Sequence, residues 1–185
     1  MIENWEAAFA PYDEDTYRFV VERIMPPDVV LDIGAGDLRL SRRMATIARR
    51  VYAVELEVGL ILQAEQAGWP ANLSVVNANA LTWPFPEEIT VAVLLMRHCT
   101  QAHFSSYVTR LSRTTNCQRL ITNARWKMGV EEMPLRSGRR YDPARVGWYA
   151  CQCGTVGFTP GDPGLITAHG LKEVAEVTHC PHCQV

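Results

Sequence analysis

One short stretch, residues 29–37 (VVLDIGAGD), constrains the fold more than any other. A strand-length apolar run is typical of a strand buried on both faces of a parallel sheet. The Gly-Ala-Gly turn leads into a helical pattern that starts at Leu40. Such a unit gathers backbone amides and a helix N-terminus around one point, and glycines at positions 34 and 36 let a ligand approach the backbone there.

Strand-length and helical patterns alternate over the first two thirds of the chain. Apolar runs predict further strands over residues 51–55, 73–77, 90–95 and 119–123. Helical spacing of apolar residues predicts helices over residues 15–25, 40–51, 57–66 and 104–111. This alternation predicts an α/β fold, a doubly wound and mostly parallel Rossmann-like sheet.

The pattern changes after residue 128. Residues 129–147 are rich in Arg, Gly and Pro and are predicted to form a loop, and short strands are expected over residues 148–150, 155–159 and 174–178. The predicted organisation is a core over residues 1–128, an Arg-rich connecting segment over residues 129–147 and a small module over residues 148–185.

Composition fits a globular protein outside the membrane. Hydrophobic residues make up 48% of the 185 residues, and no apolar run reaches the roughly 18 residues of a membrane helix. The acidic N-terminus lacks a signal pattern, so a cytoplasmic location is expected. Residues 1–96 hold 7 basic and 14 acidic side chains, and residues 97–185 hold 11 and 6. The basic half suits a polyanionic partner, although a compositional preference for arginine explains it more simply.

A polar residue lies at or after the end of each of the first three predicted strands. Asp37 at the glycine turn disfavours a pyrophosphate and favours a cationic or zwitterionic ligand. Glu55 ends the second strand, where a carboxylate accepts the hydroxyls of a ribose. Asn79 follows the third strand, where an amide reaches an adenine edge beside Ala80 and Leu81.

In these motifs, LDIGAGD, VYAVELE and NANAL, the chain resembles the class I S-adenosylmethionine-dependent methyltransferases, and it is similar in particular to the ribosomal RNA adenine dimethyltransferases. The resemblance covers about residues 12–125. It implies S-adenosyl-L-methionine as cofactor and methyl transfer as activity. The cofactor residues that it implies are Tyr12, Tyr17, Asp32, Gly34, Gly36, Glu55, Leu56, Asn79, Ala80, Leu81 and Met96.

The chain departs from that family at three places. The third glycine of the first motif falls on Leu38, and the usual Asp of the adenine loop is Asn79. The Asn-Leu/Ile-Pro-Tyr/Phe motif after the fourth strand is replaced by Met-Arg-His-Cys-Thr over residues 96–100. In that family the motif serves methylation of a base amino group, and the chain lacks it.

The replacement segment supplies the candidate catalytic residues. His98 is positioned to take a proton from the acceptor, or it caps a strand end. Arg97 suits an anionic acceptor. Cys99 is a covalent nucleophile or, more simply, a small core residue. Beyond the fifth strand, Asn123, Arg125 and Trp126 are candidate acceptor contacts, with Trp126 either stacking on a base or covering the sheet's edge.

Four cysteines near the C-terminus predict a metal site. Cys151 and Cys153 form one pair, and Cys180 and Cys183 form the second. Two such pairs suit a closed tetrahedral Zn²⁺ site that is structural rather than catalytic. The tail resembles a zinc ribbon, and a redox pair is the alternative.

The sequence therefore predicts a methyltransferase with a C-terminal zinc ribbon. RNA is the favoured acceptor, with Arg136, Arg139, Arg140 and Arg145 as a groove for phosphate or as a solvated loop. A small-molecule or protein acceptor is the alternative. A function of another class is a non-catalytic binding module that keeps the cofactor fold as a scaffold.

Overall fold

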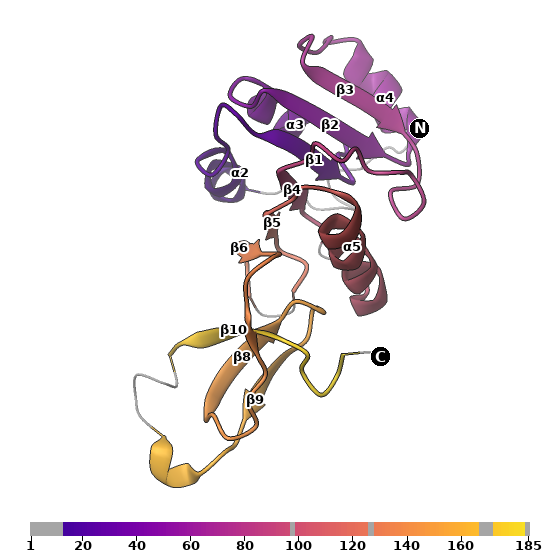
Figure 1. The fold of residues 1–185 in the computed structure, drawn as a ribbon. Helices are drawn as coiled ribbons and strands as arrows, with labels where there is room; N and C mark the ends of the chain where they lie inside the picture. Colours follow the sequence, from indigo (N-terminus) through magenta and orange to yellow (C-terminus); the bar gives the residue numbers. More distant parts are fainter. Residues whose placement is uncertain (1–12, 97–98, 126–127, 167–171, 184–185) are drawn as a thin grey trace.

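The chain forms two β-sheets that follow one another along the sequence, as the computed structural model in Figure 1 shows. The structure describes residues 13–96, 99–125, 128–166 and 172–183. In the view of Figure 1 the larger sheet and its helices lie above, and the smaller sheet lies below, beyond the strand β6 (Glu131–Pro134).

The larger sheet has six strands in the order β3-β2-β1-β4-β5-β6. Its other elements are α2 (Glu14–Val21), β1 (Val29–Ile33), α3 (Arg39–Ala45), β2 (Arg50–Glu55), α4 (Val58–Glu65), β3 (Leu73–Asn77), β4 (Val91–Leu94), α5 (Gln101–Thr114) and β5 (Arg119–Thr122). Strands β1 to β5 run parallel, and β6 is antiparallel to β5. The chain crosses from β3 to β4 at the far side of β1, which confirms the predicted doubly wound fold.

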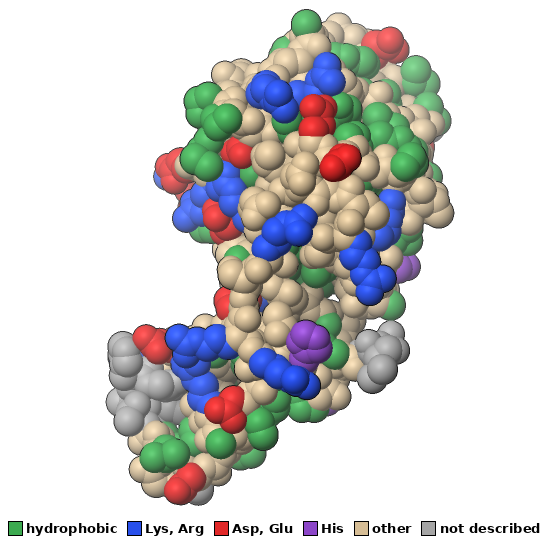
Figure 2. Space-filling view, in the orientation of Figure 1, with side chains coloured by type: hydrophobic (Ala, Val, Ile, Leu, Met, Phe, Trp, Pro, Cys, Tyr) green, Lys and Arg blue, Asp and Glu red, His purple; other side chains and the backbone are tan. Residues whose placement is uncertain are grey.

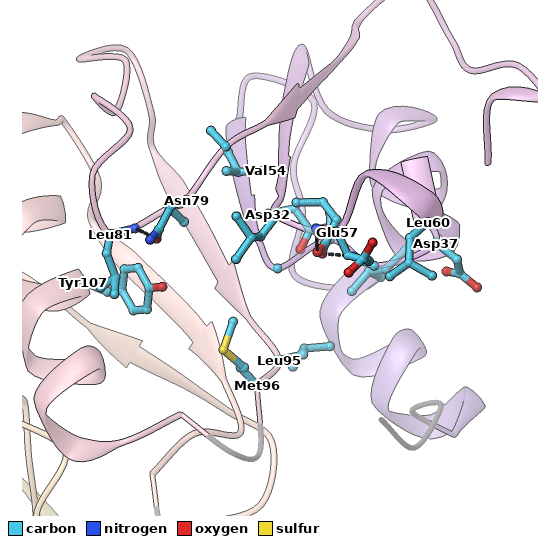
Figure 3. A pocket seen from close by; sticks show the side chains of 18 of the residues that line it. Asp32, Asp37, Val54, Glu57, Leu60, Asn79, Leu81, Leu95, Met96 and Tyr107 are labelled. Atoms are coloured by element: carbon cyan, nitrogen blue, oxygen red, sulfur yellow. Dashed lines mark hydrogen bonds between the residues drawn. The ribbon is translucent and has the colours of Figure 1, made fainter. Parts of the chain in front are cut away.

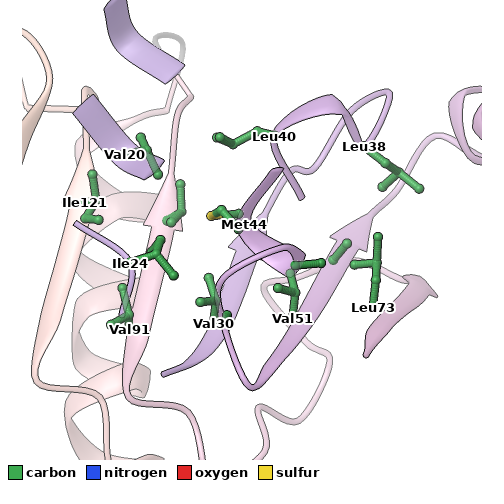
Figure 4. Close-up of a cluster of buried hydrophobic side chains, with 14 of the residues drawn as sticks. Val20, Ile24, Val30, Leu38, Leu40, Met44, Val51, Leu73, Val91 and Ile121 are labelled. Carbon is green, nitrogen blue, oxygen red and sulfur yellow. The ribbon is translucent and has the colours of Figure 1, made fainter. Parts of the chain in front are cut away.

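Helices cover both faces of this sheet, and apolar burial holds the layers together. Residues of α2, α3 and α4 pack on one face around Val30 and Val51, as Figure 4 shows in part. Helix α5 packs on the other face through Phe104, Tyr107, Val108 and Leu111. All five residues of β1 are buried. A strand covered on both faces is therefore apolar throughout, which is why its sequence was informative.

Leu38 occupies the place of the missing third glycine and keeps a left-handed backbone. Its φ is 63°, at the N-cap of α3, and its side chain is fully buried among the residues of Figure 4. The left-handed conformation costs a non-glycine residue about 1–2 kcal/mol. Burying a leucine side chain contributes about 1.5–3 kcal/mol, so packing offsets the strain.

The predicted loop over residues 129–147 is wrong at two places. Strand β6 completes the larger sheet with Met133 opposite Leu120, and β7 (Arg139–Arg140) joins the smaller one. An edge strand needs few apolar residues, and here Met133 is the buried one while Glu132 pairs with Arg119. The charged residues of β6 are the reason that the sequence pattern did not predict a strand there.

The smaller sheet has four strands in the order β7-β10-β8-β9, with β8 (Gly147–Cys151), β9 (Val156–Thr159) and β10 (Val174–Thr178). Strands β8 and β9 form a hairpin, β10 runs parallel to β8 and β7, and the short helix η1 (Pro163–Leu165) follows β9. Its small core contains Tyr149, Val177 and the cysteines. Among the described helices of the whole chain, none is long and apolar enough to cross a membrane.

A buried arginine joins the two sheets. Arg125, which follows β5, donates to Glu131 at 2.5 and 2.6 Å and to Glu176 of β10 at 2.6 and 3.0 Å. Its side chain has no exposed surface. The arginine was predicted to contact the acceptor, and that expectation is wrong because its guanidinium is enclosed by two carboxylates.

Candidate functional site

A cavity of about 460 Å³ lies at the carboxyl ends of the parallel strands. Among its lining residues are Tyr17, Asp32, Gly34, Gly36, Glu55, Leu56, Asn79, Ala80, Leu81 and Met96. Ten of the eleven residues implied by the resemblance thus meet in one hollow, and the eleventh, Tyr12, lies outside the described residues. In Figure 3, Asp32 and Glu57 lie on one side of the cavity and Asn79, Leu81 and Tyr107 lie on the other.

The glycine turn lines this cavity at Gly34 and Gly36. Gly34 has a φ of 73° and Gly36 a φ of 57°, which favour glycine. A Cβ at position 34 would lie 2.7 Å from Cε of Met96. A side chain at position 34 would therefore have to displace the end of the Met96 side chain and would also strain the left-handed backbone.

Glu55 is oriented by two backbone amides. Its Oε2 accepts from the amide of Gly36 at 2.8 Å, and its Oε1 accepts from the amide of Glu57 at 2.8 Å. Each carboxylate oxygen retains a second lone pair for another donor. The carboxylate is thus fixed beside the glycine turn and is able to accept a pair of hydroxyl groups.

Asp32 is a buried carboxyl in the cavity wall. It is 4% exposed, and Oγ of Ser41 donates to its Oδ2 at 2.5 Å. Burial chiefly, together with the nearby carboxylates of Glu55 and Asp37, raises the pKa of Asp32 from 3.8 to about 7, against the lowering effect of Ser41. A cationic group bound here would favour the ionised form of Asp32.

The loop after β3 is shaped by Asn79. The Oδ1 of Asn79 accepts from the amide of Leu81 at 2.9 Å, and its backbone carbonyl accepts from the amides of Thr82 and Trp83. These bonds form a turn that places Ala80 and Leu81 in the wall. The side-chain amide of Asn79 keeps donors for a ligand, which suits the edge of a flat heterocycle.

Another part of the cavity wall is formed by the residues after β4 and by α5. Leu95, Met96, His103 and Tyr107 line it. The predicted catalytic residues Arg97 and His98 lie outside the described residues. Burial raises the pKa of the Cys99 thiol to about 11, which disfavours the thiolate that a covalent nucleophile needs. His103 was not among the predicted site residues, and its place shortly after the fourth predicted strand was the available signal that it lies at the site.

The other acceptor predictions have different outcomes. Arg136 is exposed, and it donates from Nε and Nη2 to the backbone carbonyls of Cys117 and Thr115, so part of its guanidinium is already engaged by the backbone. Asn123 follows β5, and its buried Oδ1 has no hydrogen-bond partner among the described residues. Trp126 lies outside them.

The four cysteines of the C-terminal module meet at one point. Their sulfur atoms all lie within 4.8 Å of one another, and none forms a disulfide. Sγ of Cys151 lies 3.6 Å from that of Cys183, and Sγ of Cys153 lies 3.7 Å from that of Cys180. A tetrahedral ion with Zn–S bonds of about 2.3 Å requires S–S separations of about 3.8 Å. The four thiols therefore fit a tetrahedral metal ion.

Comparisons with known proteins agree with this geometry. Residues 16–125 match the profile of the ribosomal RNA adenine dimethylase family. Over 84 residues the chain is 32% identical to a probable ribosomal RNA small subunit methyltransferase A of Methanopyrus kandleri, covering 44% of this chain and 30% of that relative. Over 69 residues it is 36% identical to its counterpart in Methanosarcina acetivorans, covering 37% and 26%. The chain thus spans less than a third of these curated relatives.

Solved structures give the same fold. The 23S rRNA methyltransferase ErmE is 26% identical, with a TM-score of 0.51 over 60% of this chain and 46% of that one. A methyltransferase from Thiobacillus denitrificans in complex with S-adenosyl-L-homocysteine is 16% identical, with a TM-score of 0.51 over 63% and 52%. Because the family profile matches more than half of the chain, this protein belongs to the ribosomal RNA adenine dimethylase family.

Proposed function

We propose that this chain is an S-adenosylmethionine-dependent methyltransferase that acts on RNA. The observation that supports it most is the single cavity shared by the glycine turn, Glu55 and Asn79. Each of these groups suits a different part of the cofactor, and together they suit a sulfonium nucleoside better than a phosphorylated one. Family membership supports the same cofactor.

In this proposal the residues bind and orient the cofactor in three ways. Glu55 accepts the ribose hydroxyls with oxygens that Gly36 and Glu57 already orient. Asp32 pairs with the amino group of the methionine part, where its buried carboxyl gains a cation. Asn79 bonds the adenine edge, Leu81 packs on the ring, and Tyr17 covers the cofactor from α2.

The chemistry needs a nucleophile in line with a carbon–sulfur bond. When bound, S-adenosyl-L-methionine would supply a methyl group activated by its sulfonium sulfur, with S-adenosyl-L-homocysteine as the by-product. His98 takes the proton that the acceptor loses, and Arg97 holds an anionic acceptor. Met96, which directly precedes these two residues in the sequence, lines the cavity.

RNA is proposed as acceptor from the family and from the arginines. Arg139 and Arg145 line a groove of about 510 Å³ with Ser137 and Gly138, next to the smaller sheet. In Figure 2 basic side chains are spread over both parts of the molecule with acids between them, so the RNA contact would be local to such grooves. A small-molecule or protein acceptor remains the alternative, because the segment that replaces the family's acceptor motif is different.

Zinc is proposed as the ion of the cysteine site. Four sulfur ligands with tetrahedral spacing suit Zn²⁺ in a structural role. The module over residues 148–185 is proposed as a zinc ribbon on a methyltransferase core. Metal analysis of the purified chain should give about one zinc per chain.

The test is a transfer assay with labelled methyl donor against separate pools of RNA, protein and metabolites. Label should enter the RNA, and at a donor concentration below saturation its incorporation should fall by about tenfold or more with Glu55→Ala. His98→Ala should bind S-adenosyl-L-homocysteine and lose transfer. Label in the protein or metabolite pool would reject RNA as acceptor. A chain that binds the cofactor but labels no pool would favour the non-catalytic binding module.

A further inference from the structure

The turn that contains Cys151 and Cys153 also contacts α5, the helix that lines one part of the cavity. We define the cysteine turn as residues 151–155. The side-chain amide of Gln101, the first residue of α5, donates to Oγ1 of Thr155 at 2.6 Å. Sγ of Cys153 lies 3.3 Å from the same oxygen. One hydroxyl group therefore connects a candidate metal ligand to the start of α5.

A second contact lies one residue earlier in the cysteine turn. Gly154 has a φ of 94°, and its amide donates to the carbonyl of Cys151 at 2.9 Å. A Cβ at position 154 would lie 2.9 Å from Cδ1 of Phe104, whose side chain is 1% exposed. The backbone of the turn thus lies directly against the first turn of α5.

The first turn of α5 carries a residue of the cavity. His103 precedes Phe104, and its amide is capped by Oγ1 of Thr100 at 3.2 Å. His103 and Tyr107, one turn further along, both line the cavity. A shift of the first turn of α5 would therefore move side chains that line the cavity. In the sequence, α5 also comes shortly after the residues that are proposed to be catalytic.

From these contacts we infer that the cysteine turn positions the first turn of α5, and through it His103, so that filling of the metal site raises the affinity of the cavity for its cofactor. Gln101, Phe104, Gly154 and Thr155 are the positioning residues. An ion on the four sulfurs fixes the turn. Without the ion, the turn and the helix start must become ordered when the cofactor binds, which lowers affinity. This inference rests on the proposed function of the cavity.

The first experiment is a calorimetric titration of the full chain with S-adenosyl-L-homocysteine, before and after removal of zinc by a chelator. Metal analysis confirms each state. Zinc removal should weaken binding about tenfold, a typical coupling between two sites. Equal affinity in both states overturns this inference alone. Absence of binding in the zinc-loaded chain overturns the proposed function as well.

Variants separate positioning from general stability. Gln101→Ala should weaken cofactor binding about 3- to 10-fold, the effect of one hydrogen bond, with zinc content unchanged. Thr155→Val should weaken it similarly, and Thr155→Ser should restore it. Gln152→Ala is the matched control, because Gln152 lies in the same turn but donates to the carbonyls of Pro134 and Ser137. Equal effects of Gln101→Ala and Gln152→Ala, or no effect of Gln101→Ala, would overturn the inference.

Discussion

The two sheets of this molecule are held together by different means. The larger sheet is packed on both faces by apolar side chains from β1, α3 and α5, among them Leu31, Met44 and Leu111, which are fully buried. The smaller sheet has a core in which two of the four buried residues are cysteines. A sheet of this size buries little apolar surface, so we expect the proposed metal ion to supply much of its folding free energy.

Removal of the metal gives the largest expected difference between the sheets. Zinc binding contributes on the order of 10 kcal/mol to the folding of small metal-dependent modules. We therefore expect Cys180→Ser, or chelation, to abolish amide protection in β8, β9 and β10 while β1 and β4 stay protected. Hydrogen exchange measures this. Uniform loss of protection in both sheets would contradict the distinction between them.

Arg125→Ala tests the joint between the sheets. It leaves the carboxylates of Glu131 and Glu176, which are 12% and 33% exposed, without their cation. Breaking a fully buried pair typically costs about 3–5 kcal/mol, and the partial exposure of these carboxylates places the expected cost at about 3 kcal/mol or less. Denaturant unfolding measures the free energy. The control is Arg18→Ala, because Arg18 forms an exposed pair with Asp15 that contributes little. Equal unfolding free energies of the two variants would show that the ion pairs of Arg125 do not stabilise the protein.

Leu111→Ala tests the apolar packing of the larger sheet. A fully buried leucine replaced by alanine costs about 2–5 kcal/mol. The unfolding free energy should fall and the zinc content should not change. Leu62→Ala is the control, because Leu62 in α4 is 57% exposed. Loss of zinc in Leu111→Ala would mean that the two sheets do not fold separately.

The smallest expected effect is the pH dependence that the buried carboxyl of Asp32 gives to stability and to cofactor affinity. Its folded-state pKa of about 7 lies above the ordinary 3.8, so its carboxyl destabilises the free protein increasingly as the pH rises from about 4 to 7. A cationic ligand group favours the carboxylate, so cofactor affinity should rise between about pH 6 and pH 8. Asp32→Asn should remove this dependence. An affinity that falls over this range would contradict the role of Asp32.

The sequence was informative where burial alone decides the structure. The strand over residues 29–33 was predicted at its observed bounds, because a strand covered on both faces must be apolar. The meeting of Glu55 and Asn79 in one cavity also followed from their positions, since both come where parallel strands end.

The features that the sequence did not predict depend on contacts with residues elsewhere in the chain. Arg125 is buried between Glu131 and Glu176, and Glu176 lies in the other sheet, 51 residues later. Arg136 donates to the backbone carbonyls of Thr115 and Cys117, about 20 residues earlier in the chain, and no local pattern indicates this. Strand β6 was missed because its glutamates have arginine partners elsewhere in the fold.

The most direct test of the central claim is a calorimetric titration of the folded, zinc-loaded chain with S-adenosyl-L-homocysteine. Saturable binding of one ligand per chain is expected, and Glu55→Ala should weaken it by about tenfold or more, because a charged group that accepts two hydroxyls is lost. Glu57→Ala, which keeps the backbone amide that orients Glu55, should have a smaller effect. No measurable binding by the intact chain would contradict the account.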